Sequence, residues 1–314
     1  MDVLTPRALG RTGLSVTPLC VGTGELGDMT SVYGYAVPEE RALATVRSAF
    51  AGPFTFVDTS NGYGAGTSER RIGAVVRELG GVPDGVLLAT KVDPVDGGPF
   101  DGPRVRASFE ESLANLGVDR IRLLHLHDPE RITFAEATAP GGPVEVMQQL
   151  VAEGLVDHIG VTGGPIDLLR RFVATGAFEV VLTHNRWTLL DRSAEPLLAE
   201  CAAAGVAVLN GAPFGGGLLV KGPAAQPKYA YGPAREPVLA AAAAMERACA
   251  EHDVPLAAAA LQYSLREPRI TSTVVGMSRP ERLEQTIQLA THPIPDELWT
   301  VLADHAPAEE NWLR

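Results

Sequence analysis

Cysteine is scarce in this sequence: its 314 residues include only three, Cys20, Cys201 and Cys249. A small, odd set of widely separated cysteines excludes the dense disulfide framework of small secreted domains. Each one lies in an apolar or alanine-rich stretch, which favours buried free thiols. We therefore expect a protein of a reducing compartment.

Long apolar segments are also missing. No window of about 18 residues is apolar throughout, so the sequence predicts no transmembrane helix. The start, MDVLTPRALG, has no basic segment followed by an apolar one, and no secretory signal is expected. These absences predict a soluble, cytoplasmic protein, and we expect a monomer.

Positive charge is in short supply. Lysine and arginine total 26 against 38 aspartate and glutamate residues, which gives a net charge of -12. Nucleic acids and anionic membrane surfaces bind to basic faces. The charge balance argues against both, and the expected partner is a small molecule.

The glycine fingerprint of dinucleotide-binding open sheets is absent. In that motif GxGxxG follows the first strand and opens a helix. The segment GTGELG at 22–27 is close in letters but opens no helix. A doubly wound open sheet is therefore the second choice of fold.

Short apolar segments alternate with longer amphipathic ones along the whole chain. The apolar segments are rich in valine, isoleucine and leucine, as is typical of parallel strands covered by helices. The predicted strands are 18–22, 54–58, 86–90, 121–127, 156–161, 179–183, 206–210 and 271–275. The predicted helices are 38–50, 67–79, 102–117, 142–153, 165–175, 193–204, 235–251 and 279–290.

This alternation predicts one α/β domain over residues 1–314, a (β/α)8 TIM barrel. The segment RALGRTGLSVTPL, with its glycine-bearing turn, is expected to form an N-terminal β-hairpin. Glycine- and proline-rich segments at 92–103 and 211–234 predict long loops on the face where the strands end.

Ionisable residues end three consecutive predicted strands: Asp58 in FVDTS, Lys91 in LLATK and His127 in LLHLHD. Active sites of such barrels lie at the carboxyl ends of the strands. Tyr63, on the glycine-rich loop after the second strand, can fold back over the same point. Taken singly, each of these residues is ordinary for a turn or a solvated strand end.

Together the four residues predict acid–base chemistry. A free phenol with a pKa near 10 exchanges protons poorly at neutral pH. A nearby ammonium is expected to lower that pKa, and a carboxylate holds the ammonium in place. An imidazole can orient a carbonyl oxygen. This set suits proton exchange on an oxygen while a hydride moves at the adjacent carbon.

The pair His125 and His127 raises a second possibility, a metal-dependent barrel hydrolase. Two residues apart on a strand, both side chains point to the same face. A metal site needs further ligands at other strand ends, and His184 is one candidate. The eighth strand offers no convincing aspartate, so we expect no metal and interpret His125 as a hydrogen-bonded histidine one layer below the site.

The segment VVGMSRPERLEQ at 274–285 indicates an anion site. Its glycine allows close approach of the backbone, and the following helix start offers free N–H groups. Arg279 and Arg282 stand beside that start. Barrels often bind phosphate near their last strands, although a plain strand–helix connection fits the same letters.

These motifs identify the chain as resembling the aldo-keto reductase family over nearly its whole length. The carriers are LGRTGLSVTPLCVGTG, FVDTSNGYGAGTSERRIG, LLATK, NLGVDRIRLLHLHDPE, IGVTGG and VVGMSRPERLEQ. The resemblance implies a (β/α)8 barrel that binds NADP or NAD without metal. It implies that Tyr63 is the acid/base, that Lys91 and Asp58 tune it, and that His127 orients the carbonyl. The implied coenzyme contacts are Gly22, Thr23, Asp58, Thr162, Asn185, Pro213, Phe214, Gly276, Ser278, Arg279, Arg282 and Gln285.

Some positions depart from the family pattern. Many members place a tyrosine under the nicotinamide where this chain has Gly211, so Phe214 is expected to cover the ring. Glycine also stands at 276, where many NADPH-preferring members are basic. Coenzyme preference therefore stays open, and we expect use of both. Asp93, where several members are aromatic, indicates a hydroxyl-rich substrate.

The segments HNRWTLLDRS and VLNGAPFGGGLL are most similar to the branch of aldose and L-fucose dehydrogenases, with pyridoxal 4-dehydrogenase showing a similar pattern. This implies oxidation of C1 of a sugar to the lactone. Reduction of small or aromatic aldehydes and ketones, including pyridoxal, is the alternative. A coenzyme-binding subunit without catalysis, like those attached to ion channels, is the alternative of another class.

Overall fold

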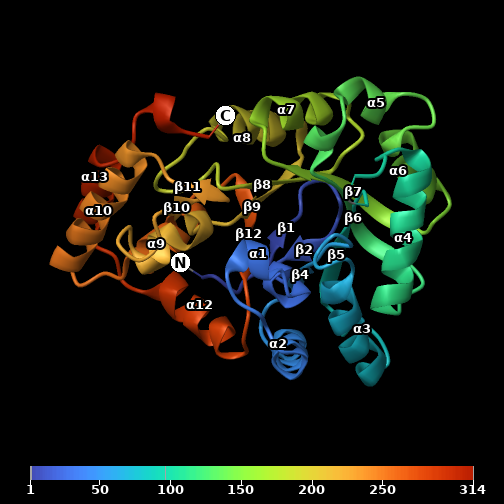
Figure 1. The fold of residues 1–314 in the computed structure, drawn as a ribbon, viewed down its shortest axis with the longest axis horizontal. Coiled ribbons are helices and arrows are strands. Elements are labelled where there is room, and N and C mark those ends of the chain that lie inside the picture. The colour runs from blue at the N-terminus through green and yellow to red at the C-terminus, as the bar shows by residue number, and fades with distance from the viewer. Residues whose placement is uncertain (1, 96, 314) are drawn as a thin grey trace.

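The computed structural model describes residues 2–95 and 97–313, and its centre is a closed barrel of parallel strands (Figure 1). Each strand pairs with the next along the chain, and the last pairs with the first. The barrel strands are β3 (Leu19–Gly22), β4 (Phe56–Asp58), β5 (Leu87–Val92), β6 (Ile121–His127), β7 (Val156–Gly163), β8 (Val180–His184), β9 (Ala207–Gly211) and β12 (Ile270–Gly276). The predicted barrel is confirmed, and the doubly wound sheet is wrong.

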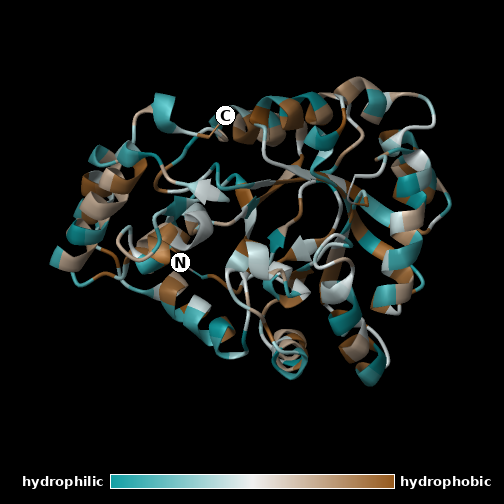
Figure 2. Ribbon diagram, in the orientation of Figure 1, coloured by the Kyte–Doolittle hydropathy of each residue, from teal (hydrophilic) through white to brown (hydrophobic). Residues whose placement is uncertain are grey.

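Helices surround the barrel in chain order, from α2 in blue through α4 in teal to α8 in yellow-green (Figure 1). Their apolar faces meet the strands and their polar faces meet water, so teal and brown alternate along them in Figure 2. The longer helices are α2 (Glu39–Ala51), α3 (Thr67–Leu79), α4 (Gly102–Leu116), α6 (Pro143–Ala152), α7 (Ile166–Ala174), α8 (Glu195–Ala204), α10 (Glu236–Glu251), α11 (Leu256–Leu265), α12 (Glu281–Thr291) and α13 (Asp296–Asp304). The short ones are α1 (Thr30–Tyr33), α5 (Phe134–Thr138) and α9 (Leu218–Lys221).

The N-terminal hairpin closes one end of the barrel. Its strands β1 (Arg7–Ala8) and β2 (Ser15–Val16) pair antiparallel, as predicted. Leu9 in its turn is fully buried and belongs to the apolar cluster that fills the lower barrel. Arg11 donates to the carbonyl of Phe178, two residues before β8 begins, so the hairpin lies at the end where strands start. The other end of the barrel, where the strands finish, is not covered by this hairpin.

Several helices were missed from the sequence: the short α1, α5 and α9, α13 after α12, and a longer helix between β9 and β12. Between β9 and β12 the prediction placed a single helix at 235–251, whereas the structure has both α10 and α11. Helix α11 is the one that packs on β12. Its sequence, LAAAALQYSL, is apolar on nearly every side, so it lacks the periodicity that reveals an amphipathic helix.

The long loops follow the third and seventh barrel strands, as expected. The second carries α9 and a small hairpin of β10 (Lys228–Tyr229) and β11 (Gly232–Pro233). Residue 96 of the first loop lies outside the described residues. The three cysteines are free and buried, as predicted. Among the residues described, no helix has the length and apolar character needed to span a membrane.

Candidate active site

Three neighbouring strands, β4, β5 and β6, bring Asp58, Lys91 and His127 to the same end of the barrel. The Lys91 ammonium is buried and donates to Asp58 Oδ1 at 2.6 Å and to the carbonyl oxygen of Thr59 at 2.7 Å. A buried charge is costly unless it is paired. Asp58 is therefore what keeps a charged lysine inside the barrel.

Tyr63 reaches back from the loop between β4 and α3 to this pair. Lys91 Nζ donates to the Tyr63 hydroxyl oxygen at 3.3 Å. The phenol ring meets the His127 ring edge-on, with centroids 5.9 Å apart. The structure thus brings all four predicted catalytic residues, Asp58, Tyr63, Lys91 and His127, to one point of the barrel mouth.

The charge balance around Tyr63 differs from the expectation. Burial raises the pKa of Tyr63 well above its ordinary value, and the negative charge of Asp58 adds to the effect. Burial and the nearby carboxylates, rather than Lys91, dominate the pKa of Tyr63, and the expected lowering is not seen. Tyr63 is therefore a phenol at neutral pH: it can donate a proton in reduction, and it can accept one in oxidation only as the phenolate that Lys91 faces.

The loop that carries Tyr63 is anchored from below by Glu69 of α3. This carboxylate is fully buried and accepts hydrogen bonds from the Thr90 hydroxyl at 2.6 Å and the Asn61 amide at 3.2 Å. Thr90 belongs to β5, beside Lys91. The loop and the catalytic strand are thereby tied to one helix.

Asp93, which the sequence interpretation linked to a hydroxyl-rich substrate, is buried and bonded to other residues of the protein. Its Oδ1 lies 2.6 Å from Nδ1 of His127, and its Oδ2 accepts from the backbone N–H of Gly62 at 2.8 Å and from the Ser60 hydroxyl. Burial raises the pKa of Asp93, but the charge and hydrogen bond of His127 outweigh this and lower it to about 2. Asp93 is thus an ionised partner of His127.

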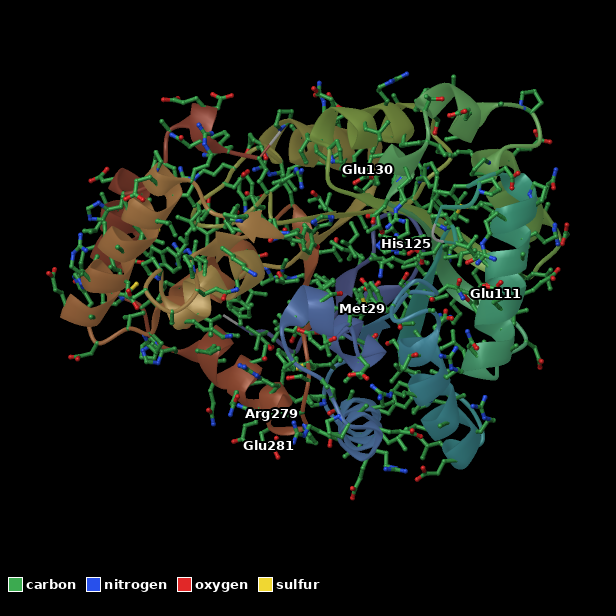
Figure 3. The ribbon with its side chains drawn as sticks, viewed as in Figure 1. Met29, Glu111, His125, Glu130, Arg279 and Glu281 are labelled. Atoms are coloured by element: carbon green, nitrogen blue, oxygen red, sulfur yellow. The ribbon has the colours of Figure 1, made fainter. Side chains whose placement is uncertain are left out.

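His125 lies one layer below, in the centre of the barrel (Figure 3). Its ring interacts with the Val161 backbone through a hydrogen bond that falls outside strict geometric limits. Burial lowers its pKa well below the ordinary value, and His125 is neutral. Residues 2–95 and 97–313 contain no group of three His, Cys, Asp or Glu side chains arranged to hold a metal ion.

The residues predicted to contact a coenzyme lie at the carboxyl ends of β3, β4, β7, β8, β9 and β12, around the same mouth. Thr162 Oγ1, Asn185 Oδ1 and Asp58 Oδ2 are buried and, in the described structure, have no hydrogen-bond partner. Buried polar atoms of this kind normally find one. Orphaned atoms of mixed donor and acceptor character fit a polar ligand such as a carboxamide.

The far side of this rim is formed by Gly276 and the start of α12, with Ser278, Arg279, Arg282 and Gln285. Figure 3 shows Arg279 and Glu281 at the outer edge of the molecule, beside that helix start. Arg279 is exposed and Arg282 is half-buried. Pro213 and Phe214 follow β9, and Phe214 packs between two apolar clusters.

Glu25 belongs to this rim although the sequence did not single it out. Its carboxylate lies against Gly276, so that a Cβ at 276 would collide with Glu25 Oε1. Burial raises the pKa of Glu25 to about 7, against the opposing charge of Arg282. The barrel closure places β3 beside β12, and this pairing is the signal that could have revealed the contact.

The substrate side of the mouth also contains residues that sequence reasoning missed. Tyr231, in the turn of the β10–β11 hairpin, meets the His184 ring with centroids 5.7 Å apart. Asp128 Oδ1 lies 3.6 Å from His127 Nε2. A carboxylate, a phenol and an imidazole around one opening suit a ligand with several hydroxyl groups.

Residues 18–306 match the model of the aldo/keto reductase family, and the chain belongs to that family. It is therefore an oxidoreductase, and enzymes of this family use NAD(P)H and act on small carbonyl or sugar substrates.

Curated relatives extend over almost the whole chain. A D-threo-aldose 1-dehydrogenase of Pseudomonas sp is 31% identical over 325 residues, covering 96% of this chain and 97% of that protein. L-galactose dehydrogenase of Arabidopsis thaliana is 34% identical over 295 residues, covering 93% and 89%. Pyridoxal 4-dehydrogenase of Microbacterium luteolum is 29% identical over 335 residues, covering 94% and 96%. The predicted resemblance is confirmed.

The fold is similar to that of an aldo-keto reductase from Bacillus halodurans solved in its holo form. The TM-score is 0.79 with 20% sequence identity, and the match covers 96% of both chains. The likeness supports the barrel architecture alone.

Proposed function

We propose that the protein oxidises C1 of an aldose, as its cyclic hemiacetal, to the lactone, with NAD or NADP as the hydride acceptor. The observation that carries this proposal is the convergence of Tyr63, the buried Lys91–Asp58 pair and His127 at one point of the mouth. The aldose and L-galactose dehydrogenases among its relatives support the substrate class.

In this reaction the C1–H bond breaks and its electron pair leaves with the hydrogen as a hydride, while the O–H proton passes to the phenolate oxygen of Tyr63 and the C=O bond forms. The coenzyme supplies the electron acceptor. Tyr63 and His127 contact the reacting oxygen from two sides. Lys91, held by Asp58, places a positive charge 3.3 Å from the Tyr63 oxygen and stabilises negative charge that develops there.

The coenzyme-binding residues divide into two groups. Thr162 and Asn185, with their orphaned polar atoms, would hold the carboxamide. Gly276, Ser278 and the start of α12 would hold the adenosine end, with Gly22, Thr23, Pro213, Phe214, Arg279, Arg282 and Gln285 completing the contacts.

A substrate panel tests the proposal. L-fucose, D-arabinose, L-galactose, pyridoxal and aromatic aldehydes are each assayed with both coenzymes. Aldose oxidation above all other activities is the expected result. A preference for aldehydes or pyridoxal would favour the alternative function, which the pyridoxal 4-dehydrogenase relative supports. No turnover together with tight coenzyme binding would favour a non-catalytic subunit.

Arg282→Ala is expected to weaken NADP binding by about 1.5–3 kcal/mol, the range of a hydrogen bond to a charged group, and to change NAD binding little. The reason is that a guanidinium at the start of α12 can grip a 2′-phosphate with two bonds. Fluorescence titration of both coenzymes measures the effect, and Arg247→Ala, at an exposed position of α10, is the control. Equal weakening of both coenzymes would instead mean that Arg282 stacks on adenine.

Glu25→Gln is expected to improve NADP binding several-fold above pH 7 while leaving NAD binding nearly unchanged. The ionised Glu25 carboxylate lies against Gly276 and near Arg282, where it competes with a phosphate for the guanidinium. The advantage should shrink as the pH falls below about 7, since the raised pKa leaves Glu25 neutral there; Tyr33, Tyr35 and Arg282 are the ionisable groups that face it. Glu284→Gln, the same change on the exposed side of α12, is the control. Equal NADP affinity in wild type and variant would contradict this role.

A further inference from the structure

His127 is held by a carboxylate that the family motifs do not include. Asp93 lies on the loop after β5, is 4% exposed, and its Oδ1 is 2.6 Å from His127 Nδ1. The other carboxylate oxygen is fixed independently by the Gly62 N–H at 2.8 Å and by the Ser60 hydroxyl. The Asp93 backbone is fixed as well, because its N–H donates to Ser108 Oγ at 3.0 Å and Arg104 Nε donates to its carbonyl oxygen at 2.8 Å.

This geometry determines the tautomer of His127. An ionised carboxylate only accepts hydrogen bonds, so the proton between Asp93 and His127 belongs to Nδ1. When His127 is neutral, Nε2 therefore carries a lone pair and can only accept a hydrogen bond. When His127 is protonated, Nε2 carries a proton and donates one. Nε2 is the nitrogen that faces away from Asp93, with Asp128 Oδ1 3.6 Å from it.

We propose that Asp93 is a positioning residue that fixes His127 as the Nδ1–H tautomer, so that Nε2 accepts a hydrogen bond from an alcohol substrate and, when protonated, donates one to a carbonyl. This inference rests on the proposed function, since it assigns His127 to the reacting oxygen. With this tautomer fixed, the pH decides whether the site binds the alcohol or the carbonyl form of the substrate more tightly. Alcohol binding is favoured when His127 is neutral, and carbonyl binding when it is protonated.

The surroundings raise the pH at which His127 changes its charge. Burial lowers the pKa of His127, but the charges of Asp93 and Asp128 and the Asp93 hydrogen bond outweigh it, so the pKa lies above the ordinary value. The titratable groups that face or influence the ring are Tyr63, Lys91, Asp93, His125, Asp128 and His184. Of these, Lys91 opposes protonation of His127 and the two aspartates favour it.

The first test is the wild-type protein. We expect ¹⁵N NMR of the histidine rings to show neutral His127 as the Nδ1–H tautomer. His158 provides an internal reference, because its Nδ1 lies 2.9 Å from Glu179 in a second carboxylate–histidine pair. A neutral His127 with its proton on Nε2 would overturn the proposal, whatever the enzyme turns out to oxidise.

The second test is Asp93→Asn. The Gly62 N–H requires an acceptor, so the amide oxygen of Asn would turn to Gly62 and its NH₂ would face Nδ1 of His127. This forces the His127 proton onto Nε2, which then only donates. We expect the alcohol KM to rise about 10- to 100-fold, the range of a lost hydrogen bond to a charged or strongly polarised group.

The reverse reaction should respond differently. The carbonyl KM is expected to stay within a few-fold of the wild-type value. A variant cannot change the equilibrium constant of the reaction, so kcat/KM must fall by the same factor in both directions. For reduction, this fall should therefore appear in kcat. The fall in alcohol affinity at low pH that we expect of the wild type should be absent from the variant. Glu179→Gln changes the His158 pair in the same way and should leave all these constants unchanged.

Two outcomes would overturn the proposal. One is an Asp93→Asn protein whose alcohol KM and pH profile match those of the wild type. The other is a variant with His127 still in the Nδ1–H form by NMR yet with the same kinetic loss, which would indicate a structural role. If the wild type oxidises nothing in the panel, the proposed function fails instead, and the NMR result still decides the tautomer. Should Asp93→Asn not fold, the wild-type NMR measurement alone remains decisive.

Discussion

Tyr63→Phe is expected to slow hydride transfer by about 10²–10⁴-fold, the usual contribution of a positioned acid or base, while coenzyme affinity stays close to that of the wild type. The hydroxyl makes one hydrogen bond among the described residues, with Lys91 Nζ, and the ring packs edge-on against His127. Phenylalanine keeps the ring and removes only the proton donor. Both directions should slow, because the same oxygen is contacted in the same transition state.

Single-turnover rates with either coenzyme, and coenzyme titrations, measure these two quantities separately. Tyr263→Phe is the matched control: the residue lies on α11, outside the mouth, and the substitution removes the same atom. A Tyr63→Phe enzyme within a few-fold of wild-type activity would remove Tyr63 from the proposed chemistry.

Lys91→Met is expected to abolish activity and also to destabilise the fold by about 3–5 kcal/mol. The side chains of Lys91 and Asp58 are 1% and 2% exposed, so the methionine variant leaves a buried carboxylate without its counter-charge. The Thr59 carbonyl oxygen also loses its donor. Urea denaturation gives the change in the free energy of unfolding.

The double variant Lys91→Met/Asp58→Asn separates stability from catalysis. Replacing both charges of a buried pair with neutral groups is often nearly neutral for stability, so we expect most of the lost stability to return. Activity should not return, since no cation then faces Tyr63. If Lys91→Met alone were as stable as the wild type, the buried pair would not be ionised as described.

The barrel could be predicted because short stretches of the sequence reveal its strands. Parallel strands buried on both faces appear as apolar runs, and β4, β5 and β6 end in charged residues that the closed topology must bring together. Helix α11 was missed because its alanine-rich sequence shows no polar face. Such a helix can be recognised only once its neighbours are known.

The contacts that tune the site were harder to predict. Asp93 was interpreted as a substrate residue because its position two after Lys91 indicates the mouth but not the direction of its side chain. That direction depends on donors in another loop, Ser60 and Gly62. The contact of Glu25 with Gly276 joins residues from opposite ends of the chain, and only the pairing of β3 with β12 places them together.

The hairpin at the start of the chain bears on the order in which coenzyme and substrate bind. The hairpin covers one end of the barrel, and apolar side chains that include the fully buried Leu9 fill the interior behind it. Coenzyme and substrate are therefore expected to approach from the other end. Two reactants that enter by the same end bind in order when one covers the other. The one that lies deeper then binds first and leaves last. We therefore expect an ordered sequence of binding and release, which follows in part from a two-strand hairpin on the side of the molecule opposite the catalytic residues.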